Sequence, residues 1–186
     1  MSKSLCIYCA SSQDIDEHYK QLAHTVGQLC ALNGWSVITG AGSEGLMGAA
    51  NTGCQEAGGK VTGIIPQWMI DRGWLQDGLD EVIVANDMAE RKQKFRDLCD
   101  AILVLPGGYG TMEELFETLT QKQLGLFDKP IVILNHNNFY DHLIEWVHLC
   151  HSQHFLRHDS DLKLFTVICT PQEIFPALGV KQTTPN

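Results

Sequence analysis

The sequence predicts an α/β protein with one Rossmann-like domain, built on a doubly wound, mostly parallel sheet. Along the 186 residues, short runs of Val, Ile and Leu alternate with longer segments of helical periodicity. The short runs are apolar throughout, as in strands of a sheet that helices cover on both faces. Such alternation favours right-handed crossovers, with ligand sites at the carboxyl ends of the strands. We expect the domain to span residues 1–180 and the tail 181–186 to fray.

The individual elements follow from these patterns. Strands are predicted at 4–10, 35–40, 60–66, 80–85, 100–107, 129–135 and 163–169. Helices are predicted at 17–32, 44–58, 87–98, 111–125, 139–153 and 171–178. The fourth helix carries an apolar stripe that we expect to face the sheet, formed by Met112, Leu115, Phe116 and Leu119. The connection 66–79 is the one long loop, and its two tryptophans predict a folded lid or a partner contact.

The composition argues against several classes of function. The net charge is −9, whereas a nucleic-acid groove or a contact with an anionic membrane depends on Lys and Arg. A small anionic ligand held by a few local donors is compatible with this charge. No run of about 18 apolar residues is present, and the first residues turn polar too soon for a signal peptide. The seven cysteines are odd in number and scattered, as expected of reduced, buried thiols in a cytoplasmic protein.

The stretch ITGAGSEGLMGAAN places Gly40, Gly42 and Gly45 in GxGxxG spacing between a predicted strand and a predicted helix. A dinucleotide site would also need an acidic residue about 20 positions on, at the end of the next strand. That strand ends in GIIPQW, without a carboxylate, so nicotinamide binding is the least favoured interpretation. Two others stay open. One is a tight structural turn, and the other is a contact of Gly42 and its neighbours with a nucleotide or sugar phosphate.

The stretch PGGYGT is the stronger signal. Pro106 ends a strand, and Gly107, Gly108 and Gly110 let the backbone direct its amides outward at a helix start, which favours a phosphate monoester. Thr111 is a candidate N-cap or hydroxyl donor. No Lys follows as in a P-loop, and no nearby aspartate suits Mg²⁺, so the turn is predicted to bind phosphate without transferring it. A purely structural turn is the alternative.

The helix predicted at 87–98 carries the basic candidates. Met88, Arg91 and Lys92 occupy neighbouring helical positions, and Glu90 and Lys94 are spaced to form an i, i+4 ion pair. Spacing alone favours a solvated basic face over a catalytic role for Arg91.

Glu113 and Glu114 open the helix after the PGGYGT turn. The helix dipole alone favours carboxylates there. Glu113 lies near the flank of the apolar stripe, whereas Glu114 lies nearly opposite it. Glu114 is therefore free to meet a ligand, a second subunit or water, and position alone favours water at least as strongly as the other two.

Two patterns in the sequence contain residue types that can bind a metal ion. Cys6 and Cys9 form a CxxC, but it lies within a predicted strand and lacks the second pair that structural zinc requires. The histidines of HLCHSQHFLRH have spacings that could bind a metal, although a surface or subunit contact is the better interpretation: His148, His151, His154 and His158. We expect no metal ion.

The motifs taken together resemble one family. MAERK followed by PGGYGTMEEL, with GLMGAAN upstream and CASS after the first strand, is similar to the LOG (Lonely Guy) phosphoribohydrolases, long labelled lysine decarboxylases. The resemblance runs from about residue 4 to residue 145. It implies hydrolysis of the N-glycosidic bond of nucleoside 5'-monophosphates, with release of a free base and ribose 5-phosphate. The substrates of the family are cytokinin riboside 5'-monophosphates and, for several bacterial members, AMP.

Carried over to this chain, the resemblance makes Arg91 and Glu114 the catalytic pair. It assigns the binding of the substrate phosphate or ribose to the second glycine turn and three further candidates: Gly107, Gly108, Gly110, Thr111, Met88, Lys92 and Ser12. Gly42 joins them through the first glycine turn. Chemically, an ionised carboxylate suits the positive charge that develops on the sugar. Arg91 can orient the substrate but is a poor proton donor.

The resemblance also sets expectations for assembly and breadth of substrate. It implies a homodimer or larger homo-oligomer and no cofactor, nucleic acid or membrane partner. One departure is Ala41, which stands where the family usually has the middle glycine of GGG. An alanine there could restrict the backbone and narrow the cleft. The alternative function is a non-catalytic nucleotide- or cofactor-binding carrier, since related proteins with PGGxGT turns bind such ligands without hydrolysing them.

Overall fold

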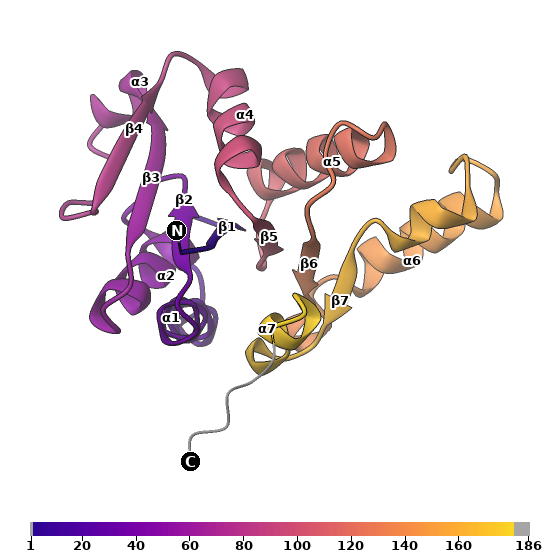
Figure 1. Ribbon diagram of the computed structural model, residues 1–186, viewed down its shortest axis with the longest axis horizontal. Coiled ribbons are helices and arrows are strands. Elements are labelled where there is room, and N and C mark those ends of the chain that lie inside the picture. The colour runs from indigo at the N-terminus through magenta and orange to yellow at the C-terminus, as the bar shows by residue number, and fades with distance from the viewer. Residues whose placement is uncertain (1, 181–186) are drawn as a thin grey trace.

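The computed structural model describes residues 2–180 and contains one seven-stranded sheet in which every strand pair is parallel (Figure 1). The strand order is β4-β3-β2-β1-β5-β6-β7. The seven predicted strands are all present: β1 (Ser4–Tyr8), β2 (Ser36–Thr39), β3 (Val61–Pro66), β4 (Glu81–Ala85), β5 (Ala101–Val104), β6 (Ile131–Leu134) and β7 (Thr166–Ile168). The predicted fold class is confirmed. The tail expected to fray, 181–186, lies outside the described residues.

Helices connect the strands in the predicted order. The α-helices are α1 (Glu17–Leu32), α2 (Gly45–Glu56), α3 (Gln67–Ile70), α4 (Met88–Leu98), α5 (Tyr109–Gln123), α6 (Asp141–Ser152) and α7 (Ile174–Ala177). Three 3₁₀ turns accompany them: η1 (His136–Asn138), η2 (Asp159–Lys163) and η3 (Pro171–Glu173). The helix predicted at 171–178 is therefore divided between η3 and α7. The short α3 lies inside the connection 66–79 and was not predicted.

Helices cover both faces of the sheet, as a doubly wound fold requires. One core cluster joins Leu5 and Ile7 of β1 to side chains of α1, α2 and α7. The other joins Cys6 and Tyr8 to α4 and α5. Because successive residues of a strand point to opposite faces, β1 is buried on both sides. Figure 1 shows α1 and α2 next to each other, away from α4 and α5.

The sheet has a topological switch point between β1 and β5. From β1 the chain adds β2, β3 and β4 on one side, and then returns to place β5, β6 and β7 on the other. The connections that follow β1 and β5 therefore diverge at the carboxyl ends of these strands. A crevice at that point is where open α/β sheets bind their ligands.

The apolar stripe of α5 is confirmed for three of its four members. Leu115 is fully buried, and Met112 and Leu119 pack against the same core cluster. Phe116 is 36% exposed and meets Trp146 of α6 edge to face, with ring centroids 5.6 Å apart. The prediction that Phe116 faces the sheet is therefore wrong, because its ring packs between two helices on the outside.

Ala41, in the first glycine turn, adopts a left-handed backbone conformation. Its φ is +63° and its side chain is fully buried. A Cβ placed on Gly63 of β3 would lie 2.5 Å from the Cβ of Ala41, so Gly63 leaves the space that the alanine methyl fills. The methyl packs against the sheet and is absent from the wall of the cavity described below. An effect of Ala41 on the width of the cleft would therefore have to act through the backbone, and it stays a prediction.

None of the helices among residues 2–180 is long and apolar enough to cross a membrane. All seven cysteines are free thiols. Five are buried, as expected, whereas Cys150 is half-buried and Cys169 is exposed.

We predict that Gly63→Ala destabilises the fold by about 1–3 kcal/mol, since the added methyl overpacks the site beside Ala41. Ala41→Gly in the same chain should recover part of that loss, because it removes the opposing methyl and the left-handed alanine together. Urea denaturation of the two single variants and the double variant measures the coupling. A Gly63→Ala chain as stable as the parent, or strictly additive effects, would show that the two methyl positions do not compete.

Candidate active site

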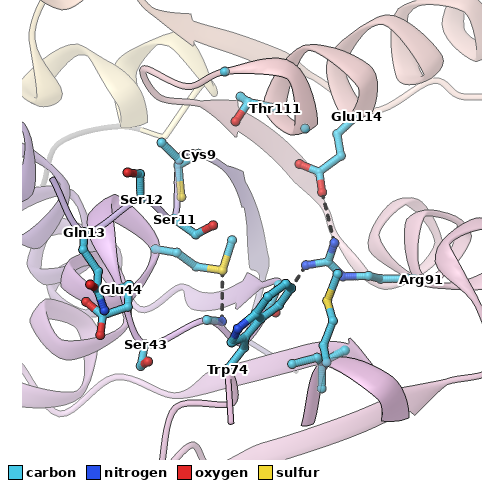
Figure 2. Close-up of a pocket in the computed structure, with 18 of the residues that line it drawn as sticks. Cys9, Ser11, Ser12, Gln13, Ser43, Glu44, Trp74, Arg91, Thr111 and Glu114 are labelled. Atoms are coloured by element: carbon cyan, nitrogen blue, oxygen red, sulfur yellow. Dashed lines mark hydrogen bonds and ion pairs between the residues drawn. The ribbon is translucent and has the colours of Figure 1, made fainter. Parts of the chain in front are cut away.

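A cavity of about 670 Å³ opens at the switch point of the sheet (Figure 2). Its wall is built from the segments that follow five successive parallel strands, β1 to β5, together with the first turns of α4 and α5. This volume lies within the range of small-molecule sites in proteins. Figure 2 shows Thr111 and Glu114 on one side of the cavity and Ser43 and Trp74 on the opposite side.

Arg91 is held rigidly in the cavity wall. It lies on α4, which begins where the Asp87 side chain accepts a hydrogen bond from the Glu90 amide at 2.8 Å. The Arg91 Nε donates to the Ile64 carbonyl at 2.9 Å, and Nη2 donates to the Gly40 carbonyl at 3.2 Å. The residue is only 6% exposed. The solvated basic face that spacing favoured is therefore wrong for Arg91, although the Glu90–Lys94 ion pair is present at 3.2 Å.

The first glycine of the GxGxxG turn, Gly40, leaves the space that the side chain of Arg91 occupies. A Cβ on Gly40 would overlap Nη2 of Arg91 and would also approach the methyl of Met47 at 3.1 Å. Any side chain at position 40 would therefore displace the guanidinium from the two carbonyl oxygens. The sequence pattern and the buried arginine are parts of one arrangement.

Glu114 faces Arg91 from α5. The Oε1 atom lies 3.6 Å from Nη1 of Arg91, within ion-pair range but too far for a hydrogen bond. Glu114 is 8% exposed, so the interpretation that it meets bulk water is wrong. Burial raises the pKa of Glu114 to about 7, although the nearby positive charge of Arg91 opposes that rise. The neighbouring Glu113 side chain stays 54% exposed and pairs with Lys92.

The N-terminus of α5 presents free backbone donors. The first bond of the helix runs from the Met112 amide to the Gly108 carbonyl at 3.0 Å, and no side chain caps the helix. The amides of Tyr109, Gly110 and Thr111 therefore come before the first hydrogen-bonded amide of the helix and have no acceptor within it. Thr111 lies inside the first turn, so its expected role as N-cap is wrong.

Of the three glycines in this turn, Gly107, Gly108 and Gly110, only Gly107 is required for space, and none has a positive φ. A Cβ on Gly108 or Gly110 would meet nothing within 4 Å, and both residues line the cavity. A Cβ on Gly107 would overlap the side chain of Thr111. The turn thus leaves an open, positively polarised helix end in the cavity.

The N-terminus of α2 differs, because its amides are already bonded. Leu46 and Met47 both donate to the Ala10 carbonyl, at 3.0 and 3.2 Å. Gly45 has a φ of +62°, and a Cβ there would lie 2.7 Å from the Ser12 carbonyl oxygen. The first glycine turn therefore joins β2 to the loop after β1. Gly42 still contributes to the cavity wall.

Eight of the ten predicted site residues come together in the cavity wall: Ser12, Gly42, Met88, Arg91, Gly108, Gly110, Thr111 and Glu114. Gly107 lies next to them, in the wall of an adjoining apolar cavity of about 410 Å³. Lys92 is in neither wall. Its Nζ forms ion pairs with Glu113 and Glu117, which tie α4 to α5.

Sequence reasoning missed much of the opposite wall. The loop after β1 contributes Cys9, Ser11 and Gln13, and the connection after β3 contributes Met69 and Trp74. The two tryptophans of the connection were the available signal, since they predicted a folded segment. Nothing in the sequence indicated which surface they would face.

No group of three or more His, Cys, Asp or Glu side chains within residues 2–180 is arranged to hold a metal ion. The histidines of the C-terminal segment have other contacts. His151 pairs with Asp159 at 2.9 Å, and His158 caps η2 together with Asp161.

The fold and the site define a Rossmann-like α/β protein with a small-molecule cavity at the switch point of its sheet. A sequence model of the family described as "Possible lysine decarboxylase" matches residues 47–178. Cytokinin riboside 5'-monophosphate phosphoribohydrolase LOG5 of Arabidopsis thaliana is 39% identical over 145 residues, which cover 78% of this chain and 64% of that protein. The phosphoribohydrolase of the same name from Mycobacterium tuberculosis is 39% identical over 144 residues, 77% of this chain and 76% of that protein. The chain belongs to the LOG family.

The fold also extends beyond this family. The molybdenum cofactor binding protein of Rippkaea orientalis superposes with a TM-score of 0.74 at 20% sequence identity, over 96% of both chains. Likeness at this level of identity concerns the fold alone. The aligned part of this chain also spans less than two thirds of the length of the Arabidopsis relative.

We predict that ionisation of Glu114 destabilises the folded chain. Its pKa is about 7 when folded, against an ordinary value of 4.5. Because the pKa of Glu114 is higher in the folded state, the folded state binds the proton more tightly than the unfolded state does. The resulting stabilisation of the folded chain is complete below about pH 4.5 and is lost as the pH rises through about 7. Glu114→Gln stays neutral. The difference in free energy of unfolding between Glu114→Gln and the parent should therefore shift in favour of the variant by on the order of 3 kcal/mol from pH 4.5 to pH 8.

Urea denaturation of both chains across this pH range measures the difference. Glu113→Gln is the matched control, since that neighbouring side chain is half exposed. A parent chain and a Glu114→Gln chain with parallel pH profiles would contradict the raised pKa.

Proposed function

We propose that the chain is a nucleoside 5'-monophosphate phosphoribohydrolase. The reaction is hydrolysis of the N-glycosidic bond of cytokinin riboside 5'-monophosphates, AMP or both, giving the free base and ribose 5-phosphate. The observation that carries the proposal is the buried Arg91–Glu114 pair beside the uncapped N-terminus of α5. The names of the relatives from Arabidopsis and Mycobacterium support it.

The helix end is suited to the substrate phosphate. The amides of Gly110 and Thr111 and the partial positive charge of the helix dipole attract a phosphate monoester. Glu114 lies one helical turn further along α5, on the cavity side. A phosphate at the helix end therefore places the ribose toward Glu114.

Glu114 has the properties of a catalytic carboxylate for this reaction. With a pKa of about 7 it is partly ionised at neutral pH, where a general base is most effective. Its ionised form stabilises the positive charge that develops on the ribose and accepts a proton from the attacking water. The water oxygen bonds to the anomeric carbon as the electron pair of the glycosidic bond leaves with the base. The base takes up a proton from solvent, and Glu114 returns to the carboxylate by releasing the proton that it accepted from the water.

Arg91 complements the acid without transferring protons. Its guanidinium stays charged at the pH of the reaction, although burial lowers its pKa. Two of its donors are fixed on backbone carbonyls, and Nη1 faces Glu114. Arg91 therefore holds the carboxylate in place and orients the substrate.

A lysine decarboxylase is a poorer match to the site. Pyridoxal chemistry needs a lysine amine in the cavity for the Schiff base. Among residues 2–180, the wall of this cavity contains no lysine, and the amine of Lys92 is engaged by two carboxylates outside it. A non-catalytic carrier is the second candidate, because the cofactor-binding protein of Rippkaea orientalis shares the fold.

A homodimer or larger homo-oligomer, in the cytoplasm, remains our prediction. Apolar side chains on the outer surface of α5 and α6 support an assembly, since Phe116, Trp146 and Leu149 are 36%, 50% and 57% exposed. Exposed apolar side chains grouped on neighbouring elements are typical of subunit contacts.

We predict that the purified protein releases base and ribose 5-phosphate from AMP or isopentenyladenosine monophosphate in the presence of a chelator. Glu114→Gln should lower turnover by at least about 100-fold, as expected for loss of a general base. Its affinity for ribose 5-phosphate should stay within about 3-fold, because the helix amides are untouched. Chromatography of the products and calorimetric titration measure the two effects.

Glu113→Gln is the matched control and should keep most of the activity, because that side chain points away from the cavity. Full activity of Glu114→Gln would remove this residue from the mechanism. Survival of both nucleotides at high protein concentration would favour the carrier.

A further inference from the structure

The wall opposite Glu114 has no role in the chemistry described so far. It contains Met69, Gly73 and Trp74 from the connection after β3. Trp74 is 47% exposed, and Figure 2 shows its ring directed into the cavity. An indole ring that faces open space beside several apolar side chains is a surface on which a flat aromatic group can stack.

The backbone around Trp74 is fixed to the rest of the site. The Ser43 amide donates to the Trp74 carbonyl at 3.3 Å, and the Trp74 amide donates to the Met69 carbonyl at 3.2 Å. Gly42 and Leu75 form an antiparallel bridge on one side of these bonds. The connection is therefore hydrogen-bonded to the turn after β2 and forms part of the cavity wall.

The ring of Trp74 is also held from outside. It meets Trp68 edge to face, with centroids 5.8 Å apart. The guanidinium of Arg72 lies 4.8 Å from the Trp68 centroid and 5.4 Å from the Trp74 centroid. Such aromatic and cation–π contacts restrict the rotation of the indole. A ring ordered in advance loses little entropy when a ligand stacks on it.

The positions of the phosphate donors and of Glu114 decide where a base would lie. A phosphate at the α5 N-terminus and a ribose at Glu114 leave two directions for the base. The adjoining apolar cavity lies behind Gly107, and its wall contains neither Arg91 nor Glu114. A base bound in that cavity would leave the ribose away from Arg91 and Glu114. The remaining direction leads across the main cavity to Trp74.

We propose that Trp74 is the stacking surface for the purine base of the nucleotide substrate, which makes it a specificity-determining residue of the site. This inference rests on the proposed function, since it takes the positions of phosphate and ribose from it. Stacking does not depend on the hydrogen-bonding edge of the base, so adenine and guanine both fit. Cytosine offers a smaller surface and gains less from the contact.

The test compares ligands with and without a base. Trp74→Ala should weaken the binding of AMP by about 5- to 100-fold, the range for loss of one base-stacking contact. The affinity for ribose 5-phosphate should change by less than about 2-fold, because that ligand ends before the wall. Trp74→Phe keeps an aromatic face and should restore most of the AMP affinity. Phe155→Ala, a change of an exposed aromatic side chain outside the walls of both cavities, is the matched control.

Binding is measured in the Glu114→Gln background, where AMP is not consumed, and KM and kcat for AMP, GMP and CMP are measured in the active chain. Trp74→Ala should raise KM for AMP and GMP more than for CMP. Equal losses for AMP and ribose 5-phosphate, or no loss for either, would overturn the inference while hydrolysis by the parent chain still stands. Absence of hydrolysis in the parent chain would instead reject the proposed function.

Discussion

The site depends on one interaction, the buried approach of Arg91 to Glu114 between α4 and α5. The two groups lie 3.6 Å apart, close enough to attract but not hydrogen-bonded to each other. A buried charge must be fixed by other partners, and the carbonyls of Ile64 and Gly40 supply them for the arginine. The carboxylate has no such partners among the described residues, so its pKa rises to about 7 and it stays available to a substrate.

The surrounding sequence is shaped by this pair. Gly40 lacks a side chain because the guanidinium occupies that space. Ion pairs from Lys92 and Arg96 to Glu117 also join α4 to α5. The two glycine turns therefore have different structural roles. The first makes room for an arginine and anchors a loop, whereas the second leaves helix amides uncovered for an anion.

Periodicity was sufficient to predict the strands and the sheet, because burial on both faces leaves an apolar run that few other structures produce. It could not place Arg91, whose burial depends on carbonyls of β3 and of the turn after β2, far away in sequence. For Glu114, helical position favoured water at least as strongly as a ligand, and only the family motif chose between them. The Trp74 wall was missed because the direction of a loop side chain depends on backbone bonds to another loop.

The most direct test of this account is to move Arg91 without removing it. In Gly40→Ala, the added methyl displaces the guanidinium from its two carbonyls while both charged residues remain in the chain. The account predicts a folded protein, by circular dichroism and thermal unfolding, whose kcat for AMP hydrolysis falls by about 100-fold, the effect of a small misplacement at a reacting centre. A folded Gly40→Ala chain with the activity of the parent would contradict the claim that the Arg91–Glu114 geometry carries the function.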